Sequence, residues 1–193
     1  MLTVPERDQA LDVAVRAVVE PLTSGRRWLP DLDVLGPALA QDGACVVTLR
    51  RSGDLLGCIG SLTPRQPLGI DVAHNAAAAG FDDPRLPVLT RRDLPLMQVH
   101  VSVLGPLTRL PVRGWAELRD QLRPGVDGLL VEDPRHRATF LPAVWQSLPA
   151  PEAFLDALWR KAGLSPRGWP SELQVSRYVV EELSGWARDH EPT

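Results

Sequence analysis

The sequence predicts an α+β fold, in which β-hairpins and helices follow one another without regular alternation. Apolar, β-branched runs pair across short turns, first around Ser52-Gly53 and again around Arg135-His136. Amphipathic helical patterns lie between and after these runs, but the strand–helix–strand repeat that builds a parallel sheet is missing. We therefore expect a mixed sheet with helices packed around it.

The amino-acid composition is that of a globular protein that is large enough to bury a hydrophobic core. The chain has 193 residues, of which 44% are apolar and 23% charged. The formal net charge of −3 shows no basic excess, so a nucleic-acid-binding role is the weakest class. Two cysteines are too few for a disulfide scaffold, and we see no metal-binding motif, signal peptide or apolar run of membrane length. A soluble cytoplasmic protein without a membrane segment is expected.

The first helix is expected from Pro5 to about Leu22. Apolar residues recur on one face at helical spacing, and Thr3 with Glu6 forms a capping-box pattern ahead of them. The next stretch, residues 26–41, is rich in proline and is expected to form a packed loop or a short helix.

A hairpin follows, formed by Ala44–Leu49 and Leu55–Leu62. A two-residue turn at Ser52-Gly53 would pair the strands so that Val47 faces Cys58. Cys45 would then share a sheet face with Cys58 at a diagonal position, too far away for a disulfide. A shift of one residue would place the thiols on opposite faces. Both registers predict two free thiols.

The remaining elements follow from the same patterns. We expect helices at 67–80, 114–122 and 152–161, strands at 97–104, 125–132 and 138–141, and a strand pattern within 172–183. The small residues Ala76 to Ala79 allow the 67–80 helix to pack closely against a sheet.

Several short motifs, taken together, resemble those of the AMMECR-one domain family, known in bacteria and archaea as AmmeMemoRadiSam system protein A. Order and spacing agree from about residue 43 to 182. Two positions depart from the family pattern, with Leu56 in place of Arg and Leu86 in place of Phe. The resemblance rests on Gly53-Asp54-Leu55-Leu56-Gly57-Cys58-Ile59-Gly60-Ser61-Leu62, Asp83-Pro84-Arg85-Leu86-Pro87, Val101-Ser102-Val103-Leu104, Gly125-Val126-Asp127-Gly128, Arg137-Ala138-Thr139-Phe140-Leu141-Pro142, Arg160-Lys161-Ala162-Gly163-Leu164 and Arg177-Tyr178.

The resemblance implies one domain over residues 1–193, built as two unequal lobes with a cleft between them. It also implies an operonic or fused association with a Memo-type protein, which is similar to extradiol dioxygenases, and with a radical SAM protein. It brings no settled activity and leaves any cofactor unknown.

The segment around Cys58 is the first candidate site. Gly57 and Gly60 flank the thiol, and glycine in a strand marks a bulge or a close approach of another chain or a ligand. Cys58 would be the nucleophile of an enzyme, and Gly57, Ile59, Gly60 and Ser61 would line a binding surface. The alternatives are a buried, inert Cys58 and glycines that serve only to pack the strand against the Ala76–Ala79 helix.

Two further pairs are candidates for binding. Asp83 and Arg85 would line a cleft, or would form a local ion pair where the preceding helix ends. Arg137 and Thr139 share one face of a short strand and could hold a carboxylate or phosphate, or could form a solvated hairpin face. His100, on a valine-rich strand, is expected to be structural.

Three hypotheses of function follow. The first is an accessory or binding protein that works with Memo-type and radical SAM partners through a cleft beside Gly57-Cys58-Ile59-Gly60. The second is an enzyme with Cys58 as nucleophile and an unidentified base. The third and weakest is a nucleic-acid-binding module.

Overall fold

A computed structural model describes residues 1–187. The described chain divides into two compact units, one comprising Met1–Leu104 together with residues 181–187, the other Gly105–Val180. The α-helices are α1 (Val4–Ser24), α2 (Leu68–Phe81), α3 (Trp115–Gln121) and α4 (Pro151–Ala162), and the strands are β1 (Asp42–Gly43), β2 (Cys45–Arg51), β3 (Asp54–Gly60), β4 (Gln66–Pro67), β5 (Met97–Leu104), β6 (Thr108–Arg109), β7 (Gly128–Glu132), β8 (Arg137–Phe140), β9 (Gln174–Tyr178) and β10 (Val180–Trp186).

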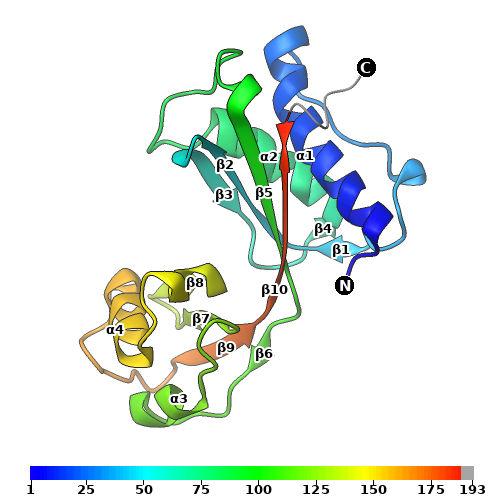
Figure 1. The fold of residues 1–193 in the computed structure, drawn as a ribbon. Coiled ribbons are helices and arrows are strands. Elements are labelled where there is room, and N and C mark those ends of the chain that lie inside the picture. The colour runs from blue at the N-terminus through cyan, green and yellow to red at the C-terminus, as the bar shows by residue number, and fades with distance from the viewer. Residues whose placement is uncertain (188–193) are drawn as a thin grey trace. The chain divides into compact units, whose positions relative to one another are not determined.

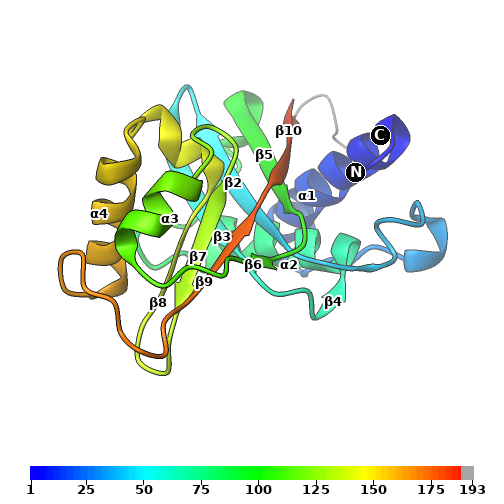
Figure 2. The same cartoon turned by 90° about the horizontal axis from the view of Figure 1, so that it is seen from below.

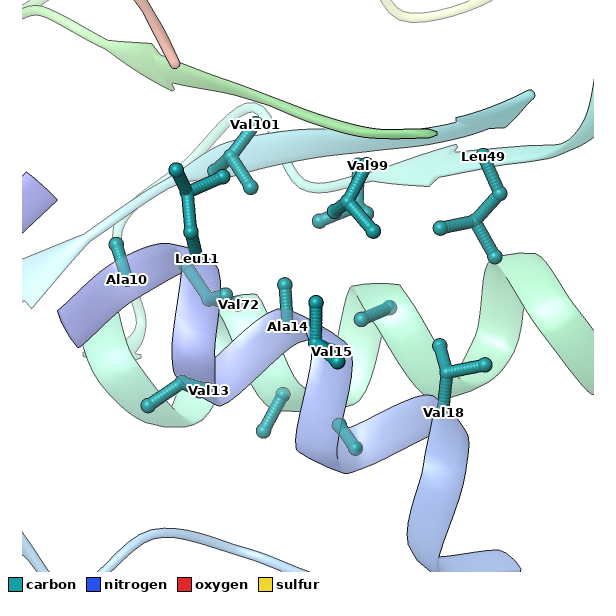
Figure 3. Packing of buried hydrophobic residues seen from close by; sticks show 14 of the residues in the cluster. Ala10, Leu11, Val13, Ala14, Val15, Val18, Leu49, Val72, Val99 and Val101 are labelled. Carbon is teal, nitrogen blue, oxygen red and sulfur yellow. The ribbon is translucent and has the colours of Figure 1, made fainter. Parts of the chain in front are cut away.

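The first unit is a four-stranded sheet with α1 and α2 packed on one face (Figure 1). The strand order is β10-β5-β2-β3, so β3 is an edge strand. Leu49, Val99 and Val101 point from the sheet toward Leu11 and Val15 of α1 (Figure 3). All five side chains are nearly or fully buried, and this aliphatic layer is the core of the unit.

The N-terminus of α1 is capped as the sequence predicts. The Glu6 carboxylate accepts hydrogen bonds from the backbone N–H of Thr3, at 2.9 Å, and from its hydroxyl, at 2.8 Å. The other carboxylate oxygen accepts from Ala38 N–H. These bonds hold the pKa of Glu6 below its usual value and tie the proline-rich 26–41 loop, which contains only a short 3-10 turn at Leu32–Val34, to the helix.

The hairpin register differs from the expected one by one residue. The turn is as predicted, with Ser52 and Gly53 both at positive φ between the paired residues Arg51 and Asp54. A β-bulge at Leu56 then shifts the pairing, so that Cys58 faces Thr48 and not Val47. Cys45 and Cys58 therefore lie on opposite faces of the sheet, and both are free thiols.

Gly57 lies where the backbone of α2 comes closest to the sheet. A Cβ atom built on Gly57 would lie 1.8 Å from the carbonyl oxygen of Ala79. No side chain fits in that space, so the glycine is required for the close approach of β3 and α2. The alanine-rich face of α2 makes the same approach possible from its side.

The second unit is a separate four-stranded sheet of order β6-β9-β7-β8, with α3 and α4 beside it (Figure 2). Its core includes Leu129, Val131, Phe154, Leu158 and Trp159. The single strand pattern expected in 172–183 is in fact two strands, since β9 pairs with β7 in this unit and β10 joins the sheet of the first unit.

These elements confirm the α+β class. Helices and antiparallel hairpins alternate irregularly, and each unit has its own core. Within residues 1–187, none of the helices has both the length and the apolar character that a membrane span needs.

Replacing Gly57 with Ala is expected to lower the free energy of unfolding by about 3 kcal/mol, because the new methyl group must push the Ala79 peptide away from β3. Urea unfolding followed by circular dichroism measures this change. Gly114→Ala is the matched control, since a Cβ there meets nothing within 4 Å, and as a change at the N-cap of α3 it should lower stability by no more than about 1 kcal/mol. Equal effects of the two changes would contradict the packing described.

Candidate functional site

The peptide group of Cys58 is held by two side chains from the loop that follows α2. Neighbouring residues of β3 bond to β2, so the N–H and C=O of Cys58 point to the free edge of the sheet. The N–H donates to Asp83 Oδ2 at 3.0 Å, and the C=O accepts from Arg85 Nη2 at 2.7 Å. The two side chains thus take the place of a neighbouring strand at this residue.

Asp83 and Arg85 are also bonded to each other. Arg85 donates from its backbone N, from Nε and from Nη2 to the Asp83 carboxylate, at 3.1, 2.8 and 2.7 Å. The Asp83 side chain is 2% exposed, whereas that of Arg85 is 62% exposed. The Arg85 guanidinium and the Cys58 N–H hold the pKa of Asp83 well below its usual range, so the carboxylate is ionised.

The Cys58 thiol is half-buried and its hydrogen-bond partner is a hydroxyl. Thr48, directly opposite on β2, donates from Oγ1 to Sγ at 3.3 Å. Within residues 1–187, neither a histidine nor a carboxylate bonds to this sulfur, so the general base that an activated cysteine needs is missing there. The pKa of Arg85 is raised chiefly by Asp83 and to a lesser extent by Cys58, so the guanidinium interacts with the cysteine as well.

Thr48 also faces His100 on β5, so Cys58, Thr48 and His100 form one row across three strands. The Nε2 atom of His100 is buried and has no hydrogen-bond partner in the described part of the chain. Burial, and secondarily the charge of Arg50, lower the pKa of His100, while Glu182 opposes them. The histidine is therefore neutral at pH 7.

A second buried carboxylate, Asp71 on α2, was not predicted from the sequence. It is 4% exposed and accepts hydrogen bonds from Cys45 N–H, Ser61 Oγ, Asn75 Nδ2 and Gln66 Nε2. Asp71 and Asn75 are polar residues four apart on the core face of an otherwise apolar helix, and that spacing was the available signal.

The other residues expected around Cys58 have definite places. Ile59 packs against the core of the first unit, and Ser61 is held by Asp71. Gly60 is exposed, but a Cβ on it would lie 2.5 Å from Val46 Cγ2. The structure thus brings Cys58, Asp83 and Arg85 together, with Gly57 and Gly60 making room for protein groups on either side.

Arg137 and Thr139 belong to the second unit, apart from the elements that carry Cys58. They share a face of β8, as expected, but their partners differ. Arg137 pairs with Glu132 at 3.2 Å on an exposed surface, whereas Thr139 Oγ1 bonds to Leu129 O and Tyr178 OH, each at 2.7 Å. Burial raises the pKa of Tyr178 to about 12, which keeps this phenol neutral.

The site at Cys58 offers a half-buried thiol and an exposed guanidinium. The thiol and the Arg85 guanidinium lie on a rigid support, and Arg85 Nη1 has no partner among residues 1–187. Within the same residues, no group of three histidine, cysteine, aspartate or glutamate side chains is placed to hold a metal ion.

Comparison with known proteins places the chain among uncharacterised relatives. The family model described as AMMECR1 matches residues 11–183. A protein of Thermofilum pendens is 35% identical over 185 residues, which cover 88% of this chain and 84% of the relative. Protein MJ0810 of Methanocaldococcus jannaschii is 31% identical, with 94% and 90% coverage. The crystal structure of uncharacterised protein PH0010 from Pyrococcus horikoshii superposes with a TM-score of 0.88 at 29% identity, covering 97% of this chain and 95% of that one.

Asp83→Asn should lower the urea midpoint of unfolding at pH 7, because an amide cannot accept the hydrogen bonds of Cys58 and Arg85 as an ionised carboxylate does. The pKa of Asp83 is depressed in the fold, so its contribution is present above about pH 4 and is lost as the pH falls toward about 2. The gap between the two proteins should close over that range. Asp82→Asn, which breaks an exposed pair with Arg27, is the control with little effect; a gap independent of pH would contradict the assignment.

His100 should make the fold less stable in mild acid. Its pKa is lowered from 6.5 in the folded protein, so the unfolded chain binds the proton first and stability falls as the pH drops below about 6.5. In His100→Gln, the unfolding free energy measured between pH 7.5 and about 5 should depend less on pH. His74→Gln, at an exposed position, is the matched control. If His100→Gln kept the full slope, another group would be responsible.

Proposed function

The chain belongs to the AMMECR1 family, and we propose that it is an accessory binding protein that presents the Cys58 surface to a partner protein. By the Cys58 surface we mean the Cys58 thiol, the Thr48 hydroxyl and the Arg85 guanidinium. All three come from the first unit and lie at or next to the free edge of its sheet.

The observation that carries the proposal is that hydrogen bonds hold the Arg85 side chain in place. Most exposed arginines lose conformational freedom when they bind, but Arg85 is already held by Asp83 and by the Cys58 carbonyl. Its Nη1 end stays available, and 62% of the side chain is exposed. A rigid, exposed guanidinium beside a half-buried thiol supports a recognition role.

The proposed partners are a Memo-type, dioxygenase-like protein and a radical SAM protein, and a cytosolic location belongs to the same proposal. These partners rest on the family resemblance. The geometry suggests how such a partner would bind. At Cys58 the edge strand is already bonded to Asp83 and Arg85, so it cannot accept another strand at that residue. We therefore expect side-chain contacts with the partner and no added β-strand at Cys58.

A second candidate is an enzyme with Cys58 as nucleophile. The Thr48 hydroxyl that donates to Sγ and the interaction of Arg85 with the cysteine favour it, because hydrogen bonds and positive charge stabilise a thiolate. Against it stands the lack of a histidine or carboxylate on the sulfur within residues 1–187. The substrate would then have to bring its own base.

Alkylation separates the two thiols of the native chain. Iodoacetamide should modify Cys58, which is half-buried, while Cys45 should react only after unfolding, because it is fully buried and burial raises the pKa of its thiol well above the usual value. Mass spectrometry of the digested protein gives both rates. Equal rates for the two thiols in the folded protein would show that the Cys58 surface is not exposed as described.

Retention of the partners tests the binding role. The tagged chain should retain the Memo-type or the radical SAM protein, and both Arg85→Gln and alkylation of Cys58 should weaken retention at least about tenfold. Arg27→Gln is the matched control, since it removes an exposed arginine that is also paired with an aspartate of the same loop. No retention of either protein, or equal loss in the control, would reject the proposal.

A further inference from the structure

The second unit holds an aspartate–histidine pair at the turn between β7 and β8. His136 Nδ1 lies 3.0 Å and 2.9 Å from the two carboxylate oxygens of Asp133. The carboxylate is fixed in turn by the backbone N–H groups of Arg135, at 2.7 Å, and His136, at 2.8 Å. The Arg135 N–H, and after it the His136 ring, hold the pKa of Asp133 below its usual range, so it is an ionised acceptor.

This arrangement determines which ring nitrogen of His136 is free. An ionised carboxylate only accepts hydrogen bonds, so Nδ1 carries the proton and, in the neutral ring, Nε2 is an acceptor. No partner bonds to Nε2 within residues 1–187. Among the histidines of that range, His136 is the one whose ring bonds to a carboxylate, since His74 bonds to the Gln66 side chain.

The His136 ring borders a hollow. His136 Cδ2, the neighbour of Nε2, lies 3.8 Å from a Cβ built on Gly163 at the end of α4. Gly163 and His136 both line a cavity of about 270 Å³, together with Leu164, Ser165, Gly168, Trp169 and Pro170. A neighbouring cavity of about 300 Å³ shares His136 and Pro170 and is also lined by Asp133, Arg135 and Glu172.

We propose that the 270 Å³ cavity is a second binding site, in which His136 Nε2 accepts a hydrogen bond from the hydroxyl group of a small ligand with a flat apolar body. The Asp133 side chain is 6% exposed and that of His136 is 31% exposed, so the acceptor is reachable while its orienting carboxylate is covered. Trp169, Leu164 and Pro170 supply apolar surface for the ligand body.

The chemistry of the cavity decides the ligand class. Apart from His136, the 270 Å³ cavity is lined by no ionisable side chain, whereas Asp133, Arg135 and Glu172 line its neighbour, so an uncharged ligand body suits the 270 Å³ cavity. Its volume lies near the lower end for small-molecule sites and suits a molecule of one ring. One fixed acceptor beside an apolar surface favours a ligand that carries a hydrogen-bond donor such as a hydroxyl, because a ligand without a donor leaves Nε2 unpaired.

The test uses the full chain at pH 8. Nitrogen-15 NMR of the imidazole rings should show His136 with a protonated Nδ1 and a bare Nε2. Titration with phenol should shift the His136 and Trp169 ring signals, and phenol should bind at least about fivefold more tightly than anisole, which has the same flat body but no hydroxyl hydrogen.

His136→Phe should abolish the preference for phenol over anisole, and His74→Phe should keep it, as the matched control on an exposed histidine. A protonated Nε2 in the unmodified chain would overturn the proposal without any variant. So would equal affinities for the two probes, binding of neither, or a preference that survives in His136→Phe.

Discussion

β3 forms one edge of its sheet, and one side of its backbone therefore has no strand to bond with. At Cys58, where that side carries both an N–H and a C=O, Asp83 and Arg85 provide the missing partners. An unpaired backbone group that is shielded from water costs about as much as a lost hydrogen bond. This requirement fixes the loop after α2, and the fixed loop in turn sets the positions of the guanidinium and the thiol.

Two carboxylates, one at each end of α2, tie the helix to the two hairpin strands. Near the start of the helix, Asp71 accepts from Cys45 N–H of β2, and just beyond its end Asp83 accepts from Cys58 N–H of β3. Gly57 lets the helix backbone reach the sheet between these anchors. Because both anchors bond to backbone N–H groups, the side chain of Cys58 takes no part in holding the helix to the sheet.

The local patterns of the sequence predict most of the elements, since helical and strand periodicity depend on nearby residues. The register of the hairpin could not be predicted, because the extra residue at Leu56 is accommodated by packing against the core of the first unit and leaves no turn signal. The candidates Cys58, Asp83 and Arg85 could be named one by one. That Asp83 would bond to the backbone of Cys58, 25 residues away, depends on where α2 ends in space. The sequence predicts that His136 lies in a turn. Its hydrogen bond to Asp133 depends on the conformation of that turn, which the sequence pattern does not specify.

Hydrogen exchange at the Cys58 amide tests the central claim, that Asp83 holds the backbone of the edge strand. In the unmodified protein this amide should exchange slowly, although it points away from the sheet, and in Asp83→Asn it should exchange at least about tenfold faster. The amide of Val47, on the internal strand β2, should keep its protection in both proteins. An unchanged rate for Cys58 in the variant would contradict the account.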